Sequence, residues 1–200
     1  MTDPVPSNVF IAIATVVAAV IAGLISVVTL TLTKEQKTSE FRQAWIDGLR
    51  QDLSEFFASA RAMARASEEL AAFGNQYTSM PFTMPAGQIG AIRQAVAVAF
   101  YRIKLRLNAE ETEHKELLRL LTRITDEQNQ QLHTQAFDSS NVIAAIETAA
   151  EYARPVLKAE WNRVKRGEPQ FRLIRNWLLP FVLVLCLFFA WLLVRSRIAA

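Results

Sequence analysis

The chain has 200 residues, of which 52% are hydrophobic and 20% are charged. This composition excludes an intrinsically disordered chain, because such chains are poor in apolar residues. The single cysteine excludes a disulfide framework and a zinc site built on several cysteines. A formal net charge of +3 gives no indication of nucleic-acid binding, so no nucleic-acid partner is expected. The apolar residues are concentrated at the two ends of the chain, and this distribution predicts a membrane protein.

The first apolar segment runs from Val9 to Leu32 and contains no charged residue. As a helix it would reach roughly 36 Å at about 1.5 Å per residue, which exceeds the ~30 Å hydrocarbon core of a bilayer. We therefore expect a membrane-spanning helix in residues 1–33. A cleaved signal peptide is the alternative, but no Lys or Arg precedes Val9 and the run is about twice the length of a signal-peptide core.

The second apolar segment runs from Trp177 to Val194, with arginines on both sides and Trp191 near its far end. Tryptophan side chains favour the interface between lipid and water, so this pattern is typical of a spanning helix. Residues 177–200 are therefore expected to form a second transmembrane helix and a short tail. A buried core helix is the alternative interpretation.

Lys and Arg residues beside the two segments predict the orientation of the chain. The eight residues before Val9 contain none, whereas six basic residues lead into the second segment and two follow it. Basic flanks remain in the cytoplasm, so residues 34–176 are expected there and both termini on the other side of the membrane. Anionic lipid headgroups are expected to contact the basic residues before the second segment, which are Arg163, Lys165, Arg166, Arg172 and Arg175.

Small residues recur at helical spacing in the first segment. Such residues let helix backbones approach closely, which drives association inside a membrane. They are Ala14, Thr15, Ala18, Ala19, Ala22, Gly23 and Ser26. The sequence therefore predicts a homo-oligomer, with docking of the two segments within one chain as the alternative. The hydroxyl groups of Thr15 and Ser26 could line a narrow pore, although such groups more often bond to their own backbone.

Residues 34–176 show helical periodicity throughout, so the expected fold is all-α, with about four cytoplasmic helices between the two spans. Apolar residues at alternating spacings of three and four form a seam in the first of these helices, continuous with the first span. The seam consists of Ile46, Leu49, Leu53, Phe56, Ala60, Met63 and Leu70. Its partner is either another copy of the chain or another helix of the same chain.

Gly74 is expected to end this helix and to open a loop that continues to Gly87. The loop is unusually apolar, because it contains Tyr77, Met80, Phe82 and Met84. It either packs back on the helices or presents a tip that binds a protein partner or touches the membrane.

Three further helices are expected after this loop. The first covers residues 88–107, and the second starts with an N-cap at Asn108 and a capping box at Glu111 and continues to about Phe137. The third continues to Arg166 and should be kinked at Pro155, which cannot donate a backbone hydrogen bond.

No catalytic constellation is present in the sequence. Glu111 and His114 match half of the ligand motif of a di-iron bundle, but the second half is missing, so a solvated first turn of a helix is expected there. Cys186 lies in the second apolar segment, where a thiolate would be costly, and is read as a small apolar side chain. We expect neither an enzyme nor a cofactor.

Three stretches of sequence, 34–46, 105–108 and 157–168, carry a resemblance to a known group of proteins. They begin with Lys34-Glu35-Gln36-Lys37, Leu105-Arg106-Leu107-Asn108 and Leu157-Lys158-Ala159-Glu160-Trp161. Together they resemble a group of small bacterial membrane proteins with a helical cytoplasmic part. The resemblance implies an inner-membrane location and brings no activity with it.

The function predicted from these features is that of a non-enzymatic, self-associating membrane protein whose cytoplasmic helices sense or bind a partner. One form of it is an effector that perturbs the membrane when triggered. The alternatives are a monomeric accessory or scaffold subunit that tethers another protein, and a small channel.

Overall fold

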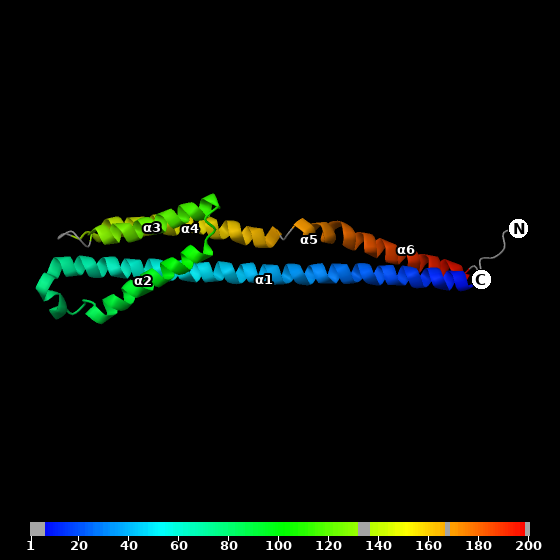
Figure 1. Cartoon of the computed structure of the whole chain (residues 1–200), viewed down its shortest axis with the longest axis horizontal. Coiled ribbons are helices and arrows are strands. Elements are labelled where there is room, and N and C mark those ends of the chain that lie inside the picture. The colour runs from blue at the N-terminus through cyan, green and yellow to red at the C-terminus, as the bar shows by residue number, and fades with distance from the viewer. Residues whose placement is uncertain (1–6, 132–136, 167–168, 199–200) are drawn as a thin grey trace. The chain divides into compact units, whose positions relative to one another are not determined.

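The computed structural model describes residues 7–131, 137–166 and 169–198. It is all-helical, with 92% helix and no strand in the part of the chain that is described. The elements, in chain order, are α1 (Ser7–Phe73), η1 (Gly74–Ser79), α2 (Ala86–Arg106), α3 (Thr112–Gln131), α4 (Ser139–Arg166), α5 (Pro169–Leu173), η2 (Ile174–Leu178) and α6 (Leu179–Ile198). Figure 1 shows them coloured along the chain.

Helix α1 runs for 67 residues without interruption, which follows from the absence of proline between Ser7 and Phe73. It ends at Gly74, whose φ of 51° lies in the left-handed region that glycine adopts without steric cost. The predicted end of this helix is therefore confirmed. The following residues form the short 3₁₀ helix η1 rather than an irregular loop.

Contacts divide the chain into two compact units. One consists of residues 42–163, and the other combines residues 1–41 with residues 164–200. We call them the core unit and the terminal unit. Each is considered by itself.

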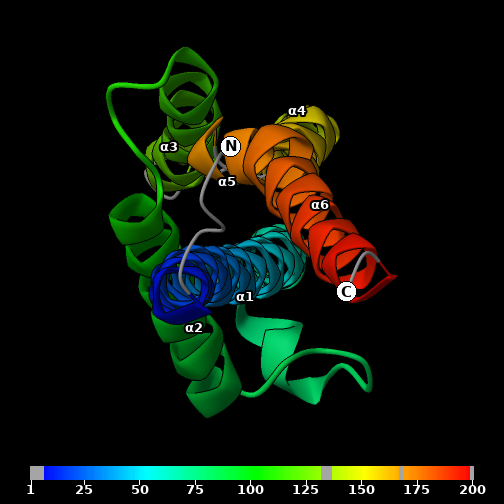
Figure 2. The same ribbon diagram turned by 90° about the vertical axis from the view of Figure 1, so that its right-hand side faces the viewer.

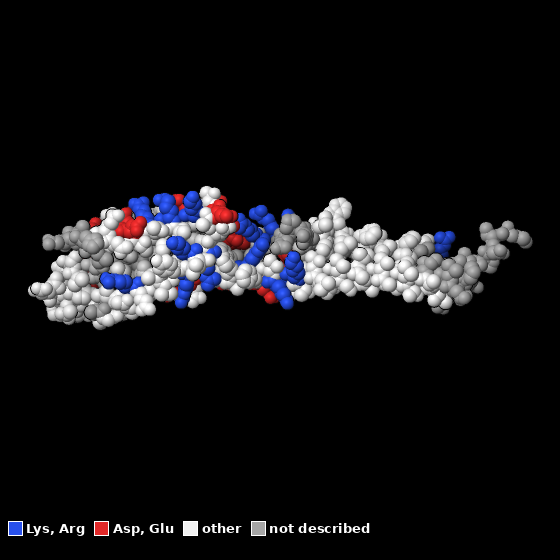
Figure 3. Space-filling model, viewed as in Figure 1, with Lys and Arg blue, Asp and Glu red and all other residues white. Residues whose placement is uncertain are grey.

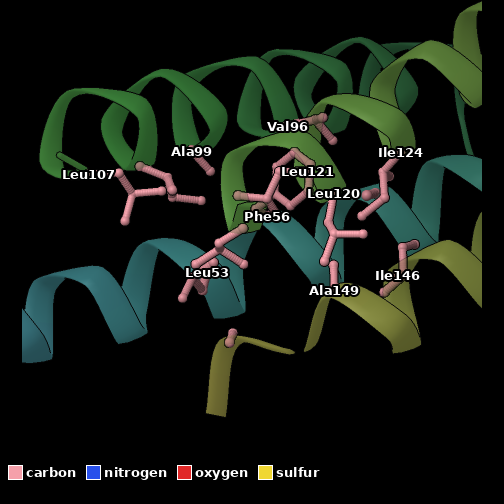
Figure 4. Close-up of a cluster of buried hydrophobic side chains, with 14 of the residues drawn as sticks. Leu53, Phe56, Val96, Ala99, Leu107, Leu120, Leu121, Ile124, Ile146 and Ala149 are labelled. Atoms are coloured by element: carbon pink, nitrogen blue, oxygen red, sulfur yellow. The ribbon is translucent and has the colours of Figure 1, made fainter. Parts of the chain in front are cut away.

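The core unit is held together by one hydrophobic cluster to which four helices contribute (Figure 4). Leu53 and Phe56 come from α1, and the ring of Phe56 is fully buried. The other three helices contribute residues at spacings of three or four, which places them on one helix face. Among them are Val96, Ala99 and Ile103 of α2, Leu117, Leu121 and Ile124 of α3, and Ile146 and Ala149 of α4. Viewed along its length, the molecule shows α2, α3 and α4 as separate helices (Figure 2).

The boundaries of α2, α3 and α4 differ from the sequence prediction at one informative place. Helix α3 begins at Thr112, not at Asn108. Asn108 instead organises the preceding turn, because its carbonyl accepts a bond of 3.2 Å from the Glu111 N–H and its side chain accepts one of 3.1 Å from the Glu110 N–H. Pro155 lies inside α4, which continues as one helix on both sides of it. Residues 132–136, expected as the end of the third helix, lie outside the described residues.

The π-helical segment η2 precedes α6, and a proline accounts for it. Pro180 has no N–H, and its ring would collide with the carbonyl of Asn176 in a regular α-helix. The wider π turn relieves this crowding, and in it the Leu179 N–H bonds to the carbonyl of Ile174, five residues earlier.

Two helices of the chain are long and apolar enough to cross a membrane, judged by length and composition. One such stretch belongs to α1 and begins at Ala14, and the other spans Phe171–Phe189. Among the most apolar 18 residues of each, only 6% are buried, whereas the core helix of a soluble protein would be mostly buried. On the face seen in Figure 3, Lys, Arg, Asp and Glu gather outside the two apolar stretches, which are almost free of them.

Phe56→Ala should lower the free energy of unfolding by about 3–5 kcal/mol, because it leaves a cavity in the cluster that four helices share. Phe82→Ala is the matched control, since Phe82 is 93% exposed, and its effect should stay within about 0.5 kcal/mol. Thermal unfolding of the full chain in detergent, followed by circular dichroism, measures both. Similar effects of the two substitutions would contradict this description of the core.

Candidate functional site

The small-residue face of α1 is open in this structure. All seven of its residues are exposed. They are Ala14, Thr15, Ala18, Ala19, Ala22, Gly23 and Ser26. A methyl group added at Gly23 would meet no atom within 4 Å. The face is therefore available for close approach by another helix.

A stripe of larger side chains on the other side of the same helix is covered, although neighbouring valines such as Val20 stay exposed. Val28 is buried, and Val17, Ile21 and Leu24 are half-buried. At 100° per residue they point away from the small-residue face. The single chain thus covers one stripe of this part of α1 and leaves the small residues exposed.

Hydroxyl groups in the apolar part of α1 are satisfied by their own helix. Thr15 donates to the carbonyl of Ile11 and Ser26 donates to that of Ala22, each at 2.9 Å. Thr29, Thr31 and Thr33 repeat the pattern, always with the carbonyl four residues earlier. Because these donors are used, the hydroxyl groups add little polarity to the helix surface.

The seam of α1 lies in the core cluster of the same chain for most of its length. Ile46, Leu49, Leu53, Phe56, Ala60 and Met63 are buried, whereas Leu70 is half exposed. The buried amide of Gln128 on α3 adds a polar tie, because its nitrogen donates to the Ala60 carbonyl at 2.8 Å. Leu70 lies outside this packing.

An ion pair joins α1 to α2 beside the seam. Asp52 is buried and accepts a hydrogen bond of 2.7 Å from Nε of Arg106. The guanidinium lies directly against Gly48, where an added Cβ would come within 2.7–2.9 Å of it. Glycine at this position therefore allows Arg106 to reach Asp52.

The apolar residues expected to form a partner loop are placed differently from one another. Tyr77 is buried, and its hydroxyl oxygen accepts a bond of 3.0 Å from the Met84 N–H. Thr83 also donates to the Tyr77 carbonyl, at 2.6 Å. Met80 and Met84 are half-buried, so only Phe82 projects fully into solvent.

The basic residues expected to touch lipid also separate into two groups. Arg163 is paired with carboxylates of the core unit, as described below. Lys165, Arg166 and Arg172 are exposed on the terminal unit. The side chain of Arg175 lies outside the described residues.

A compact polar cluster forms where α4 passes the start of α3. His114 is only 4% exposed, and its Nδ1 and Nε2 lie 4.0 Å from Glu111 Oε2 and 3.8 Å from Glu160 Oε1. Its ring also faces the indole of Trp45 on α1, with 6.0 Å between the ring centres. The expectation of a solvated first turn at Glu111 and His114 is therefore wrong: the turn packs against α4 and α1.

Hydrogen bonding assigns the proton of the His114 ring. The Asn108 N–H donates to Nδ1 at 3.2 Å, so Nδ1 must carry a lone pair. In a neutral imidazole the proton then sits on Nε2, which faces Glu160. At 3.8 Å this contact is too long for a hydrogen bond.

Arg163 supplies the positive charge between the two glutamates. Its Nη1 lies 3.0 Å from Glu111 Oε2 and 2.8 Å from Glu160 Oε1. Burial raises the pKa of Glu111, but the hydrogen bond and charge of Arg163 outweigh it, so the pKa lies below its usual value. Conversely, the bond to Glu111 and the charge of Glu160 raise the pKa of Arg163.

Glu111, His114 and Glu160 offer three donor atoms within 4.8 Å of one another, which is the kind of group that can hold a metal ion. Two features of the cluster oppose that use. The Arg163 guanidinium already bridges the two carboxylates, and the His114 nitrogen that faces Glu160 carries a proton. A metal ion needs an unprotonated nitrogen, so the residues present fit an ion-pair network better.

Sequence reasoning found Glu111 and His114 but missed Glu160 and Trp45 as their neighbours. Glu160 is 46 residues from His114 along the chain, and no local pattern connects them. The half-motif Glu111-x-x-His114 was the only available signal, and it gave no indication of α4.

No protein-family model, curated protein or solved structure matches this chain.

Glu111→Gln should destabilise the chain above pH 4.5, where the wild-type carboxylate is ionised and bound to Arg163. Since folding lowers the pKa of Glu111, its contribution is fully present above 4.5, the ordinary value, and is lost as pH falls through the lowered folded pKa. Denaturant unfolding at pH 7, 5 and 3.5 measures the difference between the two chains. A difference that stays constant across these values would contradict the ion pair.

Proposed function

We propose that the chain is an integral membrane protein that crosses the bilayer with α1 and α6 and associates with copies of itself through the small-residue face of α1. The observation that carries the proposal is that all seven small residues remain exposed, although a stripe on the other side of the same helix, from Val17 to Val28, is partly covered within the chain. The resemblance to small bacterial membrane proteins supports an inner-membrane location.

Association inside a membrane depends on close packing, because lipid tails are as apolar as the side chains they surround. Small residues on one helix face permit that approach. The hydroxyl groups on this face bond to their own backbone and therefore need no partner from a second helix. The outer surface of α6 is different in character: Phe181, Leu183, Val184, Leu187 and Phe188 are exposed there. Large side chains of this kind suit contact with acyl chains.

The core unit contributes a helical part on the cytoplasmic side in this proposal, and its role is to sense or bind a partner without catalysis. An exposed apolar stripe on α2 supports that role. Val98, Tyr101 and Leu105 follow one another at spacings of three and four and remain exposed, although the other face of α2 is buried in the core. A helix that is apolar on both faces usually has a second partner.

That same stripe also favours the second candidate function, a monomeric accessory subunit that tethers another protein. Phe82 is a further exposed apolar side chain of the core unit and is a second candidate for contact with a partner. A small channel has less support, since Thr15 and Ser26 spend their hydroxyl protons on backbone carbonyls. A membrane-perturbing effector remains one form of the self-associating protein.

Gly23→Leu should weaken self-association by about tenfold or more, because an isobutyl group blocks the approach of a second backbone. Mass measurement of the purified chain in detergent or nanodiscs should show oligomers for the wild type and a shift toward the single chain of 22.5 kDa for the variant. Val20→Leu is the control: Val20 is exposed in the same apolar stretch but lies away from the small-residue face. An unchanged mass for Gly23→Leu, or a single chain in the wild type, would favour the accessory subunit.

Orientation is tested by cysteine labelling in a Cys186→Ser background, in which no native thiol remains. In spheroplasts, a membrane-impermeant maleimide should label Thr2→Cys and Ala200→Cys at once and Asn129→Cys only after lysis. Labelling of Asn129→Cys in intact cells would reverse the proposed topology. Recovery of the chain in the aqueous fraction would remove the membrane proposal altogether.

A further inference from the structure

The cluster at His114 contains two carboxylates and two side chains that can carry a positive charge, but only Arg163 is bound to the carboxylates. Arg163 holds both Glu111 and Glu160 through the same nitrogen, at 3.0 and 2.8 Å. His114 lies between the same carboxylates, one beside each ring nitrogen, at 4.0 and 3.8 Å. Neither distance is a hydrogen bond, yet a shift of about 1 Å would make each of them one.

Neutral His114 is held in place by a single bond, in which Nδ1 accepts the Asn108 N–H. A protonated imidazole cannot accept this bond, because both of its nitrogens are then donors. The Asn108 N–H and the new Nδ1–H would face each other and repel. Protonation thus breaks the bond that now fixes the ring and creates two donors, each beside a carboxylate.

Burial strengthens the competition that follows. His114 is 96% covered by its surroundings, so an imidazolium there must be paired to be tolerated. The groups that face it are Glu111 from the turn before α3, Glu160 and Arg163 from α4, and the uncharged indole of Trp45 from α1. Only the two glutamates can pair with it.

We propose that His114 is a proton-operated switch: when it takes up a proton, the imidazolium binds Glu111 and Glu160 and displaces Arg163 from them. The proton goes to Nδ1, the Asn108 N–H loses its acceptor, and the guanidinium of Arg163 turns to solvent. Arg163 is the last residue of the core unit in the chain, so its release adds a positive charge where Lys165 and Arg166 follow. Histidine is the side chain that changes charge between pH 5 and 8, so a fall in pH is the signal.

The chain contains two histidines, which makes the test clean. In the His133→Gln variant, His114 is the only histidine, and its Cε1–H resonance can be followed alone by NMR of the full chain in micelles. It should titrate between pH 5 and 8. The backbone amide resonance of Asn108 should shift upfield with the same midpoint, because that N–H loses its bond to Nδ1.

Two substitutions in the His133→Gln background should move this midpoint in opposite directions. Arg163→Met removes the competing cation and should raise the midpoint by about one pH unit, which is tenfold in proton affinity. Glu160→Gln removes one of the two acceptors of the imidazolium and should lower it by a similar amount. Arg154→Met is the matched control, since Arg154 is an exposed arginine of the same helix, and should leave the midpoint unchanged.

The inference is overturned if His114 keeps one protonation state from pH 5 to 8, or if it titrates while the Asn108 amide resonance does not move. It is also overturned if Arg163→Met lowers the midpoint or leaves it unchanged, since the two cations would then not compete. The measurement needs no oligomer, so its outcome is independent of the proposed self-association.

Discussion

Burial of the α1 seam is the interaction on which the rest of the core unit depends. The same face of α1, from Leu49 to Met63, meets side chains of α2, α3 and α4 in one cluster. Removal of this apolar surface from water is the main favourable contribution to the free energy of folding. The hydrogen bonds beside it then favour one arrangement of the helices. Asp52 holds Arg106 of α2, and the Ala60 carbonyl receives the buried amide of Gln128 from α3. Helix α1, which carries the apolar N-terminal segment, is thus also the helix against which α2, α3 and α4 pack.

Local features of the fold were predictable from the sequence, because short-range physics determines them. Gly74 ends α1 because its backbone lies in the left-handed region, which favours glycine. The seam follows from apolar residues at spacings of three and four. Leu70 is the member of the seam that the single chain leaves half exposed, for a reason that lies elsewhere in the chain. Helix α4 begins at Ser139, which bonds to Glu68 at 2.7 Å, so little of α4 remains to cover the next turn of α1.

The cluster at His114 shows the same limit more clearly. Its members come from three segments of the chain, and charge pairing across such distances leaves no periodic trace. A glutamate and a histidine three residues apart suggested a helix surface, whereas α4 brings Glu160 and Arg163 over them and takes the histidine out of water. Tertiary packing here overrides a local interpretation that was chemically reasonable.

The close approach of Arg106 to Gly48 has a consequence for how this sequence can vary. A side chain at position 48 would force the guanidinium to shift and would disturb its 2.7 Å bond to Asp52, which would then depend more on Arg102, 3.9 Å away. A change at Gly48 is therefore better tolerated when Arg106 or Asp52 changes with it. Positions 48, 52 and 106 should accordingly covary among homologues, and a chain that keeps the acid and the arginine should keep the glycine.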